Sequence, residues 1–107
     1  MKYEVVALRR ADADVRHIAR WIAQRSLQGA ESWLDAYEEL LERLTESADT
    51  YASATEDADF DIPLKQALFG TPRGRTYRAL FTIVGNQVRI LRIRGPGQPT
   101  LVQDELW

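Results

Sequence analysis

The chain has 107 residues, a length that fits one domain, and we expect a single domain over residues 1–107. The absence of cysteine excludes disulfides and thiolate metal sites, and no apolar run approaches the roughly 20 residues that cross a membrane. The net charge of −2 hides a segregation, because residues 31–61 carry eleven acids against Arg43 alone. Residues 62–103 carry seven basic side chains and no acid, which predicts an anion- or partner-binding surface.

The first half of the chain predicts a strand and two helices. Residues 2–8 are rich in β-forming side chains and predict a strand, and their apolar run is too short for a signal peptide, so we expect a cytoplasmic protein. Apolar residues then recur at helical spacing after Asp12 and Asp14, either of which could cap the helix. A short break at 27–29 precedes a second helix over 30–48, with a wide apolar face opposite a row of acids. Two helices joined so closely predict an antiparallel helical hairpin.

The second half of the chain predicts a sheet. Residues 49–63 lack periodicity and are mostly small or acidic, so we expect a solvated loop. Three strands follow, over 64–70, 76–84 and 87–93, and a two-residue Gly-Asn turn joins the last two. The order is β-α-α-β-β-β and the fold class is α+β. We expect the helical hairpin on one face of a small antiparallel sheet, with the other face partly open to solvent.

Arginines recur along the last two strands. Pairing across a two-residue turn places Arg78 opposite Ile93, and it places Arg92 and Arg94 on the other face of the sheet. An arginine on the open face favours a binding role for Arg78, and the alternative is an ion pair with the acidic helix or loop. Arg92 and Arg94 have two interpretations as well, which are bridges to the acids of residues 31–61 and contacts with nucleic acid or an acidic partner.

Four other side chains complete the candidate binding residues. Arg73 and Arg75 lie in a glycine-containing turn, where the alternatives are phosphate contact and solvated charge. Arg89 belongs to the basic strand pair, and Trp21 falls off the main apolar stripe of its helix, where exposure would favour a partner surface. His17, the only histidine, is interpreted as a surface or boundary residue. No spacing of His, Asp or Glu indicates a metal site, so we expect no metal and no cofactor.

The element order and the strand pair YRALFTIVGNQVRILRI resemble the RelE/ParE superfamily of toxins from type II toxin–antitoxin modules. The segment DADVRHIARWIAQRSLQGAESWLDAYEELLERL resembles the ParE branch, with its acidic start, Ile/Trp pair and leucine-rich second helix. The resemblance covers residues 3 to 98. It implies a small toxin that an antitoxin wraps around and neutralises. RelE-like members cut mRNA in the ribosome, whereas ParE-like members poison DNA gyrase and lack the nuclease residues.

The RelE catalytic residues are only partly present when the resemblance is carried over position by position. Arg78 matches the arginine of the first hairpin strand, and Lys65 matches one of the lysines before it. The later arginine falls near Gln98, within Gly-Pro-Gly-Gln, and the tyrosine falls near Asp104, so both are missing. Arginine can clamp a phosphate but hardly ever releases a proton, which leaves the chain without an evident general acid.

These observations predict the toxin of a type II module, ParE-like, that binds and inhibits a target such as DNA gyrase and serves plasmid stabilisation. Two alternatives stay open. One is a ribosome-dependent mRNA endonuclease with Lys65 and Arg78 as catalytic residues. Whether the chain is an enzyme is therefore open, although the missing catalytic residues argue against an enzyme. The other is a non-toxic antitoxin-binding module or decayed toxin. The expected partners are a cognate antitoxin and either gyrase or the ribosome with its mRNA, in a homodimer or a toxin–antitoxin hetero-oligomer.

Overall fold

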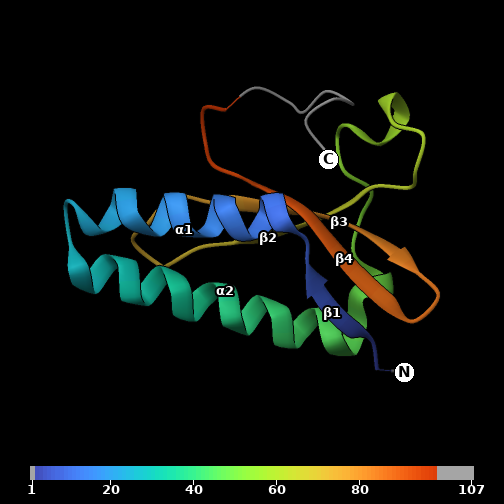
Figure 1. The fold of residues 1–107 in the computed structure, drawn as a ribbon, viewed down its shortest axis with the longest axis horizontal. Coiled ribbons are helices and arrows are strands. Elements are labelled where there is room, and N and C mark those ends of the chain that lie inside the picture. Colours follow the sequence, from blue (N-terminus) through green and yellow to red (C-terminus); the bar gives the residue numbers. More distant parts are fainter. Residues whose placement is uncertain (1, 99–107) are drawn as a thin grey trace.

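The structure, a computed structural model, describes residues 2–98. Its elements are β1 (Glu4–Ala7), α1 (Arg9–Ala23), α2 (Leu27–Ser47), β2 (Lys65–Phe69), β3 (Tyr77–Val84) and β4 (Gln87–Arg94), with short 3-10 turns η1 (Ala48–Thr50) and η2 (Asp57–Asp59). The helices α1 and α2 form a hairpin beside one four-stranded sheet of order β1-β4-β3-β2 (Figure 1). The predicted α+β class and the order β-α-α-β-β-β are confirmed.

The sheet is mixed rather than wholly antiparallel. The pairs β2–β3 and β3–β4 are antiparallel, as predicted, whereas β1 lies parallel to β4, with Val5 opposite Val88. Parallel neighbours need a long connection, and here all the other elements lie between β1 and β4 in sequence. The first strand therefore becomes an edge strand of the sheet, beside β4.

Both helices begin earlier than predicted. The first helix starts at Arg9 without a capping side chain, so the predicted capping role of Asp12 or Asp14 is wrong. The second helix includes the predicted break at 27–29, because Ser26 caps it and accepts a backbone hydrogen bond from its first turn at 2.9 Å. The turn between the helices is consequently residues 24–26, as long as the predicted break but three residues earlier in the chain.

The main core lies between the helical hairpin and one face of the sheet. Leu40 and Leu44 of α2 are fully buried there against Phe81 and Ile90 of the central strands. Each such side chain stabilises the fold by about 1.5–3 kcal/mol relative to exposure. The leucine-rich face of the second helix thus has the packing role that its periodicity predicted.

An aromatic cluster extends this core where β2 ends and β3 begins. Trp33 and Tyr37 of α2 lie one helical turn apart and stack, with 6.2 Å between ring centroids. The centroids of Phe69 and Tyr77 lie 5.6 and 5.3 Å from that of Trp33. Ring pairs at such separations attract each other. The cluster therefore fixes Tyr77, at the start of β3, against the second helix.

Tyr37 gives the core a pH dependence that can be measured. Burial raises the pKa of Tyr37 to about 12, and the charge of Asp12 acts in the same direction. An acid with a higher pKa in the folded state contributes its full stability below its usual pKa of 10, and it loses that contribution as the pH rises to 12. We expect the free energy of unfolding to fall by about 2–3 kcal/mol over this range through Tyr37.

The Tyr37→Phe variant separates this effect from general alkaline denaturation. Within residues 2–98 the buried hydroxyl of Tyr37 has no hydrogen-bond partner, so its removal should change stability little at pH 7. Between pH 10 and 12 the variant should lose less stability than the parent chain in urea denaturation followed by circular dichroism. Equal losses in the two proteins would show that another group is responsible.

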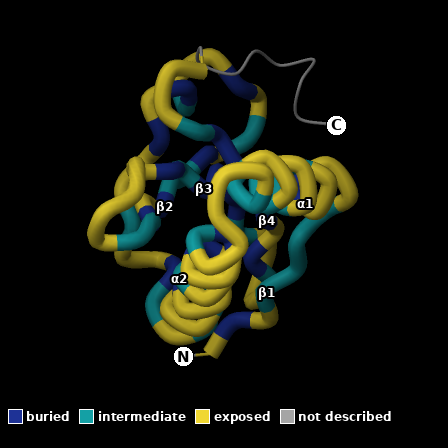
Figure 2. The backbone as a smooth tube through the Cα atoms, turned by 90° about the vertical axis from the view of Figure 1, so that its left-hand side faces the viewer, coloured by how far each residue is buried: buried dark blue, intermediate teal, exposed yellow. Residues whose placement is uncertain are grey.

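The second face of the sheet is partly open, as expected, since Leu68 of β2 is 54% exposed and Arg89 of β4 is exposed, but its centre is covered. The cover is residues 51–64, which we call the covering segment. Its Ala54, Phe60 and Leu64 pack against Leu80 and Leu91 of the sheet. Buried and exposed residues alternate irregularly along it (Figure 2). Phe60, Ile62 and Leu64 alternate with Asp61 and Pro63, but this stretch is short and lies in a segment rich in acids, so the sequence predicted a solvated loop.

A β-bulge changes the predicted register of the last two strands. The pairing next to the turn is as predicted, but it shifts near the middle of β3, where Leu91 is the extra residue. Beyond the bulge Arg78 faces Arg94, so the predicted pairing of Arg78 with Ile93 is wrong. An extra residue moves the side chains that follow to the opposite face. Arg94 consequently shares the face of Arg78 instead of lying on the other one.

Candidate functional site

The predicted site residues separate into two groups in the structure. Lys65, Arg78, Arg92 and Arg94 belong to the sheet and are partly or fully buried, and Arg89 of β4 is exposed. Trp21, Arg73 and Arg75 are exposed and gather beside α1. Only the second group lines a cavity among those described below.

Arg78 is paired with a buried carboxylate. Its two terminal nitrogens each donate to one oxygen of Glu56 at 2.8 Å, and Nη1 also donates to Oε1 of Gln66 at 3.0 Å. Glu56 is 1% exposed, so the acid interpreted as solvated is in fact buried. The hydrogen bonds to Glu56 raise the pKa of Arg78, although burial opposes them. Of the two interpretations of Arg78, the structure contains the ion pair, formed with the covering segment.

Lys65 is engaged by the same part of the chain. Its ammonium donates to the carbonyl of Tyr51 at 2.6 Å and to that of Asp49 at 3.5 Å. Within the covering segment, Asp57 accepts the backbone N–H of Leu64 at 2.7 Å. The two residues that match nuclease positions therefore hold the covering segment on the sheet.

Arg92 bridges to Asp14 of the first helix, an acid outside the range 31–61 that one interpretation named. Its Nε and Nη2 donate to the two carboxylate oxygens of Asp14 at 2.7 and 3.0 Å. Asp14 also accepts the backbone N–H of Ile93 at 3.0 Å. Arg94 is 5% exposed, and Arg89 donates to the side chain of its strand neighbour Gln87 at 2.6 Å.

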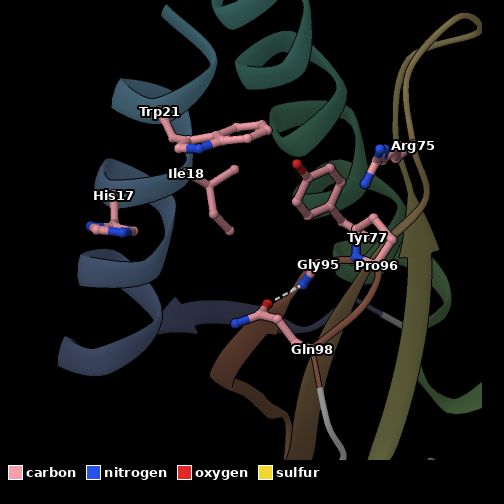
Figure 3. Close-up of a pocket in the computed structure, with 8 residues that line it drawn as sticks. All are labelled: His17, Ile18, Trp21, Arg75, Tyr77, Gly95, Pro96 and Gln98. Carbon is pink, nitrogen blue, oxygen red and sulfur yellow. Dashed lines mark hydrogen bonds between the residues drawn. The ribbon is translucent and has the colours of Figure 1, made fainter. Parts of the chain in front are cut away.

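The second group of residues lines two adjoining cavities, each of about 320 Å³. Trp21, Arg75 and Tyr77 line both of them. The first cavity is completed by His17 and Ile18 of α1 and by Gly95, Pro96 and Gln98 after β4 (Figure 3). The second is completed by Ile22, Gly29 and Trp33 of the helices and by Thr71, Arg73 and Gly74 of the β2–β3 connection. We call the two cavities together the α1 groove.

A tight connection places the two arginines at the edge of the α1 groove. A side chain at Gly70 would come within 2.5 Å of the carbonyl oxygen of Arg75, so only glycine allows the two ends of the connection to approach this closely. Gly74 closes the turn by donating its N–H to the carbonyl of Thr71 at 3.0 Å. The glycines of this segment are therefore explained by the backbone path that presents Arg73 and Arg75.

The Gly-Pro-Gly-Gln segment forms the other end of the groove. A side chain at Gly95 would lie 3.0 Å from the ring of Tyr77, and Gly97 has a φ of +83°, a conformation that favours glycine. The side-chain oxygen of Gln98 accepts the N–H of Gly95 (Figure 3). The residues that stand where RelE-like members have their later arginine thus form an uncharged rim of the groove. The place of the family tyrosine, near Asp104, lies outside the described residues.

The α1 groove is aromatic and cationic. Trp21 is 48% exposed, and the guanidinium of Arg25 lies 4.0 Å from the centre of its ring, an attractive cation–π arrangement. No Asp or Glu between residues 2 and 98 lines either cavity. Burial raises the pKa of Tyr77, and the charge of Arg75 opposes that change. The groove therefore suits a ligand that is both apolar and negatively charged.

Sequence reasoning found some of this site and missed the rest. It placed Trp21 off the apolar stripe of its helix, where the structure has it 48% exposed, and it named Arg73 and Arg75. It missed Tyr77, and it did not place His17 in a cavity. The groove is lined by residues of α1, of the β2–β3 connection and of the end of β4. These segments are distant in sequence, so no local sequence pattern predicts that they lie together. Within the described residues no group of three His, Asp or Glu side chains could hold a metal ion.

Comparisons with known proteins agree with the fold and identify the family. Residues 5–98 match the family model described as the ParE toxin of type II toxin–antitoxin systems, parDE. A search of curated proteins finds no match. Among solved structures, the chain is similar to a chain of the chromosomal ParDE toxin–antitoxin system from P. aeruginosa, with a TM-score of 0.61 and 18% identity. That match covers 88% of this chain and 96% of the other, and at this identity it shows the fold. Within residues 2–98 neither helix has the length and hydropathy of a membrane span.

Proposed function

The chain belongs to the family of ParE toxins of type II toxin–antitoxin systems, and we propose that it acts by binding and inhibiting DNA gyrase. An antitoxin would be its partner, since the family is defined by such pairs. A cytoplasmic location and a role in plasmid stabilisation belong to the same proposal.

The state of Arg78 is the observation that most supports inhibition by binding over RNA cleavage. A ribonuclease of this fold would need Arg78 and Lys65 to meet the substrate phosphate and move a proton. Here Glu56 accepts from both terminal nitrogens of Arg78, and backbone carbonyls accept from Lys65. A phosphate could reach Arg78 only by displacing a carboxylate that is itself almost fully buried.

Induction of the chain alone in a bacterium tests this proposal. We expect growth arrest within minutes, with no new RNA 5′ ends inside translated frames by transcriptome-wide mapping. The purified chain should also inhibit DNA supercoiling by gyrase in a dose-dependent manner, and an equal amount of heat-denatured chain is the control.

The other outcomes point to the alternatives. New cuts inside translated frames would assign the chain to the ribosome-dependent nucleases. Arrest with neither cuts nor gyrase inhibition would indicate a different bound target. Normal growth together with active gyrase would leave a module that only binds an antitoxin, or a decayed toxin.

A further inference from the structure

The α1 groove consists of two compartments with a shared wall. Trp21, Arg75 and Tyr77 line both cavities, one on the side of Ile18 and the other on the side of Ile22. Each cavity has about 320 Å³, at the lower end of the roughly 300–1,000 Å³ typical of ligand pockets. Two small compartments in a row suit two side chains of one peptide segment better than one compact small molecule.

The shared wall also carries a charge that no acid among residues 2–98 pairs with in an ion pair. Of the three residues that line both cavities, Arg75 is the charged one. Ion pairs within residues 2–98 join Lys2 to Glu46, Arg78 to Glu56 and Arg92 to Asp14, and Arg75 takes part in none of these three. A carboxylate from a partner would therefore meet an available guanidinium at the boundary between the compartments.

Trp21 supplies apolar surface at the same boundary. Trp21 is 48% exposed, and its ring lies opposite Tyr77 across the first cavity (Figure 3). The guanidinium of Arg25 lies 4.0 Å from the centre of the ring, and its Nη1 donates to the backbone oxygen of Trp21 at 3.3 Å. A tryptophan already fixed in place loses little conformational freedom on binding, and such residues dominate binding energies at interfaces.

From this geometry we infer that the α1 groove binds an antitoxin segment with two bulky apolar side chains on either side of an Asp or Glu. One apolar side chain enters each compartment, and the carboxylate between them binds Arg75. The inference rests on the proposed function only in assigning the segment to the antitoxin. The recognition pattern itself follows from the two cavities, the exposed tryptophan and the absence of acids among the described lining residues.

Selection from a displayed library of random twelve-residue peptides, with the purified full-length chain as bait, tests the pattern without an assumed partner. We expect enriched peptides to share two bulky apolar residues that flank an acid. A labelled synthetic copy of an enriched peptide should bind at least tenfold more weakly to Trp21→Ala and to Arg75→Glu. Arg16→Glu is the matched control, because Arg16 is exposed on α1 and lines neither cavity, and it should change the affinity less than twofold.

A charge exchange gives a gain of binding that misfolding cannot imitate. Replacing the acid of the peptide by lysine should abolish binding to the parent chain and restore binding to Arg75→Glu. Enrichment of basic peptides, no enrichment, or equal binding by all three variants would overturn the inference. The toxicity test is independent of this one, since selected peptides can bind a chain that fails to arrest growth, and a toxic chain can select a different pattern.

Discussion

The Arg78→Ala variant should lose about 3–5 kcal/mol of the free energy of unfolding, because it removes the guanidinium that pairs with a buried carboxylate. Glu56 is 1% exposed, and in the parent chain it accepts two hydrogen bonds of 2.8 Å from Arg78. The side chain of Arg78 is 21% exposed, so the pair lies inside the protein and is screened little by salt. Urea denaturation at pH 7, followed by circular dichroism, would measure the loss.

Two controls separate this pair from the general acidity of the covering segment. Asp59→Ala removes an exposed acid nearby and should change stability by no more than about 0.5 kcal/mol. The double variant Glu56→Leu with Arg78→Met should regain most of the loss, because apolar side chains often replace a buried ion pair at little cost. A loss below about 1 kcal/mol in Arg78→Ala would mean that the pair is effectively solvated. In that case Arg78 could serve a ligand after all.

The same result decides how a loss of toxicity should be understood. Arg78 stands at a position that matches a nuclease arginine, so an inactive Arg78→Ala variant invites a catalytic explanation. If the variant is also destabilised by several kcal/mol, the covering segment has lost its main attachment and activity falls through the fold. Toxicity should therefore be compared between Arg78→Ala and the stabilised double variant, since neither retains the guanidinium.

The element order could be predicted because each element carries its own local signal. The second helix shows its buried face as leucines at helical spacing, and Leu40 and Leu44 are indeed fully buried. The last two strands are recognisable as runs of β-branched and aromatic residues on either side of a Gly-Asn turn. In the structure Gly85 has a φ of +62°, a conformation that favours glycine. Such signals depend only on residues that are close in sequence, so a single sequence is enough to recognise them.

The details that decide the site depend on contacts between distant residues. The bulge at Leu91 moves Arg94 to the face of Arg78, and nothing in the spacing of β4 distinguishes it from a regular strand. Glu56 reads as one of several loop acids, and only the position of Arg78, 22 residues further on, makes it a buried one. The sequence thus revealed which side chains were candidates, but the partners of Arg78 and Arg92 required the structure.

Asp14 is the second position where substitution should have a large effect. The Asp14→Ala variant should lose about 2–3 kcal/mol of the free energy of unfolding, the usual cost of losing hydrogen bonds to a charged group. Asp14 accepts from Arg92 at 2.7 and 3.0 Å and from the backbone of Ile93 at 3.0 Å, and its side chain is 18% exposed. It thereby joins α1 to β4 just beyond the bulge. Urea denaturation would measure the loss, with the exposed Asp12→Ala as matched control, expected to cost less than about 1 kcal/mol.

The Asp14→Asn variant distinguishes the two roles of this carboxylate. An amide oxygen can still accept the N–H of Ile93, but it gives up the charge that holds Arg92, so this variant should lose less stability than Asp14→Ala. Equal losses in the two would mean that the contact to Ile93 contributes nothing. Because β4 runs on into Gly95 and Gln98, which line the α1 groove, the amide NMR signals of these two residues should shift more in Asp14→Ala than in Asp14→Asn. Unchanged signals in both would show that the groove keeps its rim without this bridge, and Arg92 would then serve stability alone.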